Sequence, residues 1–130
     1  MTVEDFLRGV VTDSLPNFNG NIHDANGMSF PEFLSEKSTE TPSIFISYEG
    51  FSDVEYYSDG SGNVLTENYS LYIRCNDSVK THVKALMVAL GGKYSEFTDD
   101  DDAVKYVQII SGQTFRDNGA DAFEITLQIK

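Results

Sequence analysis

The stretch NVLTENYSLYIRCN, residues 63–76, alternates apolar and polar side chains over most of its length, and it decides the fold. Side chains of a strand point alternately to its two faces, so the pattern predicts one long strand. About twelve residues at ~3.3 Å each would span roughly 40 Å, more than the ~35 Å diameter of a compact domain of this size. Its apolar face, interrupted at Glu67, consists of Leu65, Tyr69, Leu71, Ile73 and Cys75.

The residues before this strand predict its partner in a long hairpin. PSIFISYEG, 42–50, is an apolar β-rich run that ends at Gly50, and SDVEYYS, 52–58, is the next strand. DGSGN, 59–63, is a turn in which Gly60 and Gly62 are expected to adopt positive φ. A hairpin that extends past its core exposes backbone donors and acceptors along an edge, which a neighbouring chain can cover.

Apolar residues at helical spacing predict two amphipathic helices. The first spans residues 2–15, with Thr2 as its cap and Pro16 as its end. The second begins after Asp77 or Ser78 and ends at Gly91-Gly92. The expected buried stripes are Val3, Phe6, Leu7, Val10 and Val11 in the first helix and Val79, Val83, Leu86, Met87 and Leu90 in the second.

The remaining segments complete a mixed fold. Residues 17–29 are predicted as a loop, and a short helix is predicted from Ser29 through FPEFLSEK. A polar loop then leads to strands at 104–112 and 122–130, the last alternating strictly. We therefore expect one domain, 1–130, of the α+β class: a mostly antiparallel β-sheet with a long hairpin and two or three helices packed on one face. The inward side chains of the last strand are Phe123, Ile125, Leu127 and Ile129.

The charge of the chain limits its partners. Nine basic and twenty-one acidic residues give a net charge of −12, which argues against binding nucleic acid through phosphates and against anionic membranes. No apolar run approaches the ~20 residues of a membrane span, and the first residues do not have the pattern of a signal peptide. Cys75 is the single cysteine, which excludes an internal disulfide and a four-cysteine zinc site.

No residue pattern indicates catalysis, a cofactor or a metal. The carboxylates of residues 99–102 would repel one another rather than converge on a cation, and an EF-hand starting at Asp59 fails at Val64 and Ser70. Cys75 and His82 could be a nucleophile and a base, but a cysteine on an apolar strand face behaves as a small hydrophobe. We therefore predict that the protein is not an enzyme and holds neither cofactor nor metal.

The candidate functional residues are those of an interface. Tyrosines are numerous on the hairpin strands, where they can serve cross-strand packing or contact with a partner. The acidic loop is expected to be solvated and able to meet basic side chains of a partner. The predicted interface residues are Asp59, Gly60, Gly62, Asn63, Glu67, Tyr69, Tyr72, Asp99, Asp100, Asp101 and Asp102.

The order of these segments resembles a known family. PSIFISYEGF, a glycine-turn hairpin, NYSLYIRCND running into the helix VKTHVKALMVAL, and the closing FEITLQIK are similar to tail-terminator or tail-completion proteins of long-tailed phages and phage-derived particles. The similarity covers most of residues 42–130. It implies a homo-oligomeric, commonly hexameric ring that caps the tail tube, ends its polymerisation and joins it to the neck. It also implies tube and neck proteins as partners, and the virion tail, assembled in the host cytoplasm, as location.

A second interpretation rests on charge alone. An acidic protein can mimic DNA and inhibit a basic nucleic-acid enzyme. Such a mimic needs acidic groups spaced like phosphates along one face, whereas the dense acidic run here is confined to residues 99–102. Asp53, Glu55 and Asp59 add carboxylates near the hairpin. Capture of a nuclease that weakens with salt would favour the mimic, and oligomeric mass would favour the ring.

Overall fold

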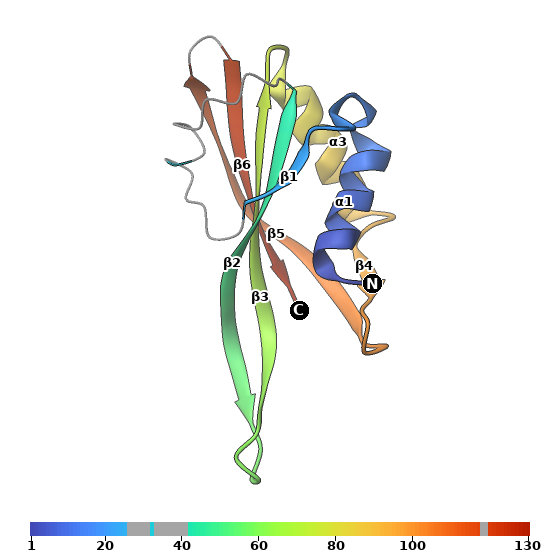
Figure 1. Cartoon of the computed structure of the whole chain (residues 1–130), viewed down its shortest axis with the longest axis vertical. Coiled ribbons are helices and arrows are strands. Elements are labelled where there is room, and N and C mark those ends of the chain that lie inside the picture. Colours follow the sequence, from blue (N-terminus) through green and yellow to red (C-terminus); the bar gives the residue numbers. More distant parts are fainter. Residues whose placement is uncertain (26–31, 33–41, 118–119) are drawn as a thin grey trace.

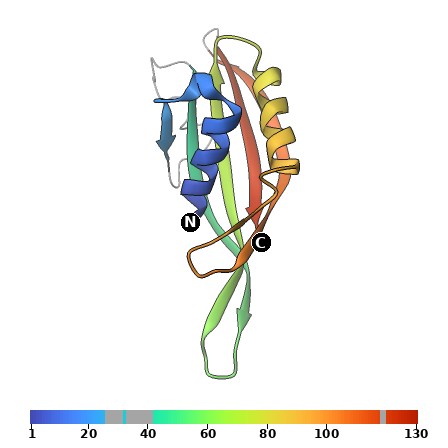
Figure 2. The same ribbon diagram turned by 90° about the vertical axis from the view of Figure 1, so that its right-hand side faces the viewer.

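The computed structural model describes residues 1–25, 32, 42–117 and 120–130 (Figure 1). In these residues six strands form one sheet in the order β1-β2-β3-β6-β5-β4. The β1–β2 pair is parallel, and the other pairs are antiparallel. Helices α1 and α3 cover the same face of the sheet (Figure 2). The prediction of an α+β fold with a mostly antiparallel sheet is confirmed.

Helix α1, Val3–Ser14, begins where the sequence predicted. The Thr2 hydroxyl accepts a hydrogen bond from the backbone N–H of Asp5 at 3.1 Å, which satisfies one of the free donors of the first turn. The buried face of the helix consists of Phe6, Leu7, Val10 and Val11. A short 3-10 helix, Pro16–Phe18, follows directly. The short helix predicted from Ser29 lies outside the described residues.

Helix α3, Val79–Gly91, also follows the prediction, except at one position. Val79, Val83, Leu86 and Leu90 are buried, but the side chain of Met87 is exposed, so its assignment to the core was wrong. Positions 79, 83, 86 and 90 follow the 3.6-residue period closely, and Met87 lies beside that stripe. The chain after α3 returns to α1, where the ring of Phe6 stacks on Phe97 with centroids 4.2 Å apart.

Strands β2, Ser43–Tyr56, and β3, Gly62–Cys75, form an antiparallel pair. The sequence predicted two strands divided at Gly50, which was wrong. The structure has one continuous strand, and its register with β3 shifts between Tyr48 and Gly50. This shift is a β-bulge, and Gly50 accommodates it with a φ of 108°. In the connecting turn Gly60 has a φ of 86°, as predicted, whereas Gly62 already belongs to β3 and does not have positive φ.

Strand β3 lies at the centre of the sheet. Its second half pairs with β2 on one side and β6, Ala120–Ile129, on the other, so that Leu71 faces Ile46 and Ile125. These three side chains are buried beneath the helices with most of the apolar core. Ser70, Tyr72 and Arg74, which point to the opposite face, are buried as well. Both faces of this half of β3 are therefore closed to solvent.

Three further strands differ from the sequence prediction. β1, Ile22–Asp24, lies in the predicted loop 17–29, and β4, Glu96–Thr98, lies in the polar loop after α3. β5, Val104–Asp117, runs beyond its predicted end at residue 112. The two short strands form because β2 and β5 offer them unpaired backbone groups, a cause that acts over long range.

Gly112 on β5 is expected to resist substitution. A Cβ at this position would lie 2.7 Å from Cε1 and 2.9 Å from Cζ of the Phe123 ring, so Gly112→Ala should lower the free energy of unfolding by about 1 kcal/mol. Gly9 is the matched control, because it lies in α1 with open space around it and Gly9→Ala should stabilise by up to about 1 kcal/mol. Urea denaturation of both variants checks this, and a stabilised Gly112→Ala protein would contradict it.

Candidate interaction site

Residues 50–66 of β2 and β3 form a two-stranded arm that extends beyond the rest of the sheet (Figure 1). β1 pairs with β2 only as far as Ile46, and β6 pairs with β3 only as far as Glu67. In the part of the chain that the structure describes, no strand pairs with either outer edge of the arm. Its backbone donors and acceptors are therefore open to another chain.

The arm contributes no side chain to the apolar core of the described residues. It exposes large apolar groups instead: Phe51 is 58% exposed, Tyr56 77% and Tyr57 48%. Leu65, predicted to lie on the buried face of its strand, is 43% exposed because the helices do not reach this part of the hairpin. Exposed aromatic side chains on an unpaired edge are typical of a surface that a partner covers.

The tip of the arm is a tight turn. One carboxylate oxygen of Asp59 accepts hydrogen bonds from the Ser61 hydroxyl at 2.6 Å and from the Ser61 backbone N–H at 2.8 Å. These bonds hold the pKa of Asp59 below its ordinary value. The predicted interface residues Asp59 and Gly60 therefore lie at the outermost end of the arm, where they shape the turn.

A groove of about 600 Å³ lies between the β3 side of the arm, from Gly62 to the base, and the turn that joins β4 to β5. Several predicted interface residues, distant in sequence, line it together: Gly62, Asn63, Glu67, Tyr69, Asp99, Asp100 and Asp101. The sequence did not indicate that the start of α1, Tyr48, Lys105 and Ile129 complete its walls. Asp102 and Tyr72 lie outside this groove.

Tyr69 and Tyr72 are packed within the chain. Tyr69 donates a hydrogen bond from its hydroxyl to Glu4 at 3.0 Å, and its ring meets Tyr48 edge-on at 5.2 Å. Tyr72 donates to Glu49 at 2.9 Å. Burial, reinforced by these carboxylates, raises the pKa of both phenols. The aromatic rings that the hairpin offers to a partner are those of Phe51, Tyr56 and Tyr57 instead.

The acidic run of residues 99–102 forms a turn that is held by hydrogen bonds to the side chain of Asp99. A carboxylate oxygen of Asp99 accepts hydrogen bonds from the backbone N–H groups of Asp101 and Ala103, both at 2.9 Å. The other oxygen lies 4.0 Å from the ammonium of Lys105. Asp102 takes a φ of 60°, a left-handed conformation that aspartate tolerates better than most residues. Asp99 is thus a structural residue, and Asp100, Asp101 and Asp102 carry the exposed charge.

Asp99→Ala is expected to lower the free energy of unfolding by about 1–2 kcal/mol, because two backbone donors lose a charged acceptor. Asp101→Ala is the matched control, since it removes an equal charge from the same turn and should change stability by less than about 0.5 kcal/mol. Chemical denaturation of the two variants gives the comparison. Equal effects would show that the turn does not depend on the Asp99 carboxylate.

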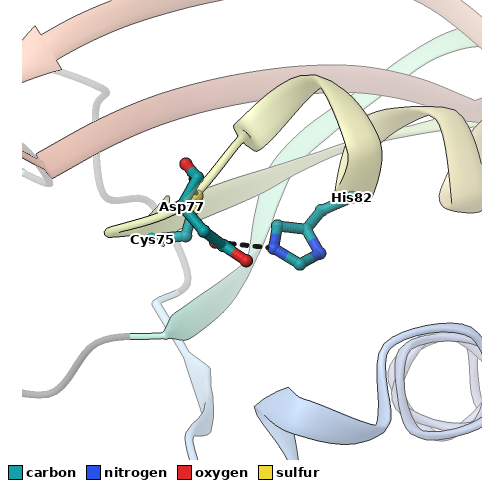
Figure 3. Close-up of side chains that lie close together, drawn as sticks. All are labelled: Cys75, Asp77 and His82. Atoms are coloured by element: carbon teal, nitrogen blue, oxygen red, sulfur yellow. Dashed lines mark hydrogen bonds and ion pairs between the residues drawn. The ribbon is translucent and has the colours of Figure 1, made fainter.

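A second cluster lies where β3 leads into α3 (Figure 3). The sulfur of Cys75, a carboxylate oxygen of Asp77 and a ring nitrogen of His82 all lie within 4.8 Å of one another. Nε2 of His82 is 2.9 Å from Asp77, and the His82 ring meets Phe18 edge-on at 5.1 Å. The hydrogen bond from His82 is the main cause that lowers the pKa of Asp77.

Cys75 has the properties of a structural thiol. It is fully buried and donates a weak hydrogen bond to the backbone carbonyl of Asp77 at 3.5 Å. Burial raises its pKa to about 11, so the thiol stays protonated at neutral pH. A nucleophile or a metal ligand needs the thiolate. The cluster therefore fixes the start of α3 and does not present an activated nucleophile.

Cys75 should react slowly with an aromatic disulfide reagent at pH 8. With a pKa of about 11, its thiolate fraction is on the order of a hundredfold below that of an exposed cysteine with pKa ≈ 8.5, and burial slows attack further. Because the pKa of Cys75 is higher in the folded than in the unfolded chain, the protonated thiol contributes to the stability of the fold. This contribution is complete below about pH 8.5 and is lost as the pH rises towards 11. Reaction in denaturant is the control, and an equal rate in the folded protein would contradict the assignment.

No protein-family model matches the chain, and the search of curated proteins gives no match. Within the described residues, no helix combines the length and the apolar character needed to cross a bilayer.

Proposed function

We propose that this protein is a structural subunit of a phage tail or of a phage-tail-like particle. Copies associate through the arm into a closed ring that caps the tail tube, ends its polymerisation and joins it to the neck. The observation that carries the proposal is the arm of residues 50–66, which lies outside the apolar core and has both edges open in the described chain. The resemblance of the element order to tail-terminator proteins supplies the identity of the ring.

The arm is better explained by a partner than by folding of the single chain. An isolated two-stranded hairpin is marginally stable in water, and open strand edges with exposed aromatic residues promote unwanted association. A neighbouring copy would pair or cover these edges and bury Phe51, Tyr56 and Tyr57. Repetition of one such contact around an axis closes a ring.

The charge of the chain suits a ring through which DNA passes. At a net charge of −12, the surface repels phosphates and does not hold a passing strand. The acidic groove along the β3 side of the arm and the exposed carboxylates of residues 100–102 add to this repulsion. This support is weaker than that of the arm, since net charge also serves solubility.

The mass of the assembled protein tests the proposal. Native mass spectrometry and sedimentation at micromolar concentration should give a defined oligomer, with six copies as the expected number. When tube protein of the same particle is added, the growing tube should bind the oligomer, and polymerisation of the tube should then stop. A strictly monomeric species, with and without tube protein, would overturn the proposal, and salt-sensitive capture of a basic nuclease by that monomer would support the DNA mimic instead.

A further inference from the structure

A second depression, of about 660 Å³, lies between the end of α1 and the exposed side of α3. Its floor is apolar and consists of Ala85, Val88 and Ala89, with the side chain of Val88 70% exposed. Lys84 and Lys93 stand at its rim together with one acidic residue, Asp13. This α3 groove combines exposed apolar surface with positive charge, which is unusual for so acidic a chain.

The positive charge around the α3 groove is concentrated in sequence as well as in space. Residues 79–93 contain Lys80, Lys84 and Lys93, three of the nine basic residues of the chain, and no acidic residue. Lys80 and Lys84 form no ion pair with any described residue, while Lys93 lies 3.5 Å from Asp13. Unpaired lysines beside an apolar floor favour a ligand that is both acidic and apolar.

The arm has the complementary composition. Residues 50–66 contain Asp53, Glu55 and Asp59 and no basic residue, together with the exposed aromatic side chains of the arm. The arm points away from α3 in both views (Figures 1 and 2), so it does not reach the α3 groove of its own chain. The arm of a second copy can reach this groove, because its position is not fixed relative to α3 of the first copy.

We infer that the α3 groove receives the arm of a second copy of this chain. Aromatic side chains of the arm would cover Ala85 and Val88, while its carboxylates face Lys84 at the rim and Lys80, which precedes Lys84 by one turn of α3. Because the arm and the α3 groove are different surfaces, the contact is head-to-tail, and repetition of it closes a ring. The inference rests on the proposed self-association and names the surface that accepts the arm.

Charge reversal tests the pairing. Glu55→Lys in the arm and Lys84→Glu in the α3 groove should each weaken self-association at least tenfold, measured by sedimentation as a function of concentration. Both side chains are exposed, so folding should be unaffected, as circular dichroism can verify. A chain carrying both substitutions should recover association, since the reversed arm then meets a reversed α3 groove. Glu96→Lys and Lys130→Glu, which are exposed and belong to neither surface, are the charge-matched controls and should associate normally.

The outcomes separate this inference from the proposal beneath it. If the unmodified protein is monomeric, both the proposed ring and the inferred contact with the α3 groove are contradicted. If it is oligomeric and neither Glu55→Lys nor Lys84→Glu weakens it, the ring stands and the α3 groove is not the acceptor. If each single substitution weakens association and the double substitution does not restore it, the arm does not pair with the α3 groove. Recovery in the double variant alone supports the assignment.

Discussion

Replacement of residues 52–66 by Asn-Gly should convert the oligomer to a folded monomer. Phe51 and Glu67 are paired across the hairpin, and a two-residue Asn-Gly loop closes such a pair without splaying the strands. The apolar core contains no residue of the deleted segment, so the domain should keep its fold. Native mass spectrometry should show a single copy, a fall in mass of several-fold, while near-ultraviolet circular dichroism remains that of a folded protein.

A substitution at the exposed tip, Ser58→Ala, is the control, because it alters the arm without shortening it and should leave the oligomeric mass unchanged. The arm-deleted chain also separates folding from assembly. If it retained the mass of the unmodified protein, the arm would not be the contact between copies. If it failed to fold, the arm would contribute to the stability of the domain, contrary to its position outside the core.

Leu71→Ala should cause the largest loss of stability among single substitutions on β3. Leu71 is fully buried, lies between Ile46 and Ile125 in the sheet, and is covered by the helices. Removing its side chain leaves a cavity in a closely packed core, and we expect a loss of about 3 kcal/mol. The midpoint of thermal unfolding should fall by roughly 10 °C.

Leu65→Ala on the same strand is the matched control, since the same atoms are removed from a side chain that is 43% exposed. Its cost should stay below about 1 kcal/mol. Urea denaturation at neutral pH gives both values. Equal losses at positions 65 and 71 would mean that the arm is as closely packed as the body of the sheet.

The elements predicted correctly are those whose own sequence carries a repeating apolar stripe. α1 shows the helical period at Phe6, Leu7 and Val10, and β6 shows strict alternation at Ile125, Leu127 and Ile129. Each of these elements buries one face against the same core, so the pattern is local and readable. In α3, Met87 was misplaced because it borders the buried stripe of the helix.

The elements that the sequence missed depend on partners far along the chain. β1 has three residues and forms because β2 lies beside it, which no local pattern records. β2 itself was divided at Gly50, since a glycine at the end of an apolar β-rich run is typical of a turn. The bulge at that position could be recognised only from the pairing with β3.

The residues of the candidate site were predicted from the sequence, but their arrangement in space was not. The acidic run and the hairpin were identified as surface, and the structure brings Glu67 and Asp100 to one groove although more than thirty residues of sequence lie between them. The structural role of Asp99 depends on backbone donors of its own turn, which the repeated aspartates conceal. The basic side of α3 is visible in residues 79–93, which contain three lysines and no acidic residue, but no local pattern there indicates a groove.

The extra residue in β2 at Tyr48–Gly50 gives the arm a direction of its own. A bulge bends its strand and increases the local twist, while the pairs on either side, Tyr48 with Tyr69 and Phe51 with Glu67, stay matched. Losing or gaining one residue there would therefore re-aim the arm without disturbing its partner strand or the core. In a head-to-tail ring the angle between neighbours fixes how many copies close the circle. The stoichiometry of such a particle would then be set by a single backbone irregularity.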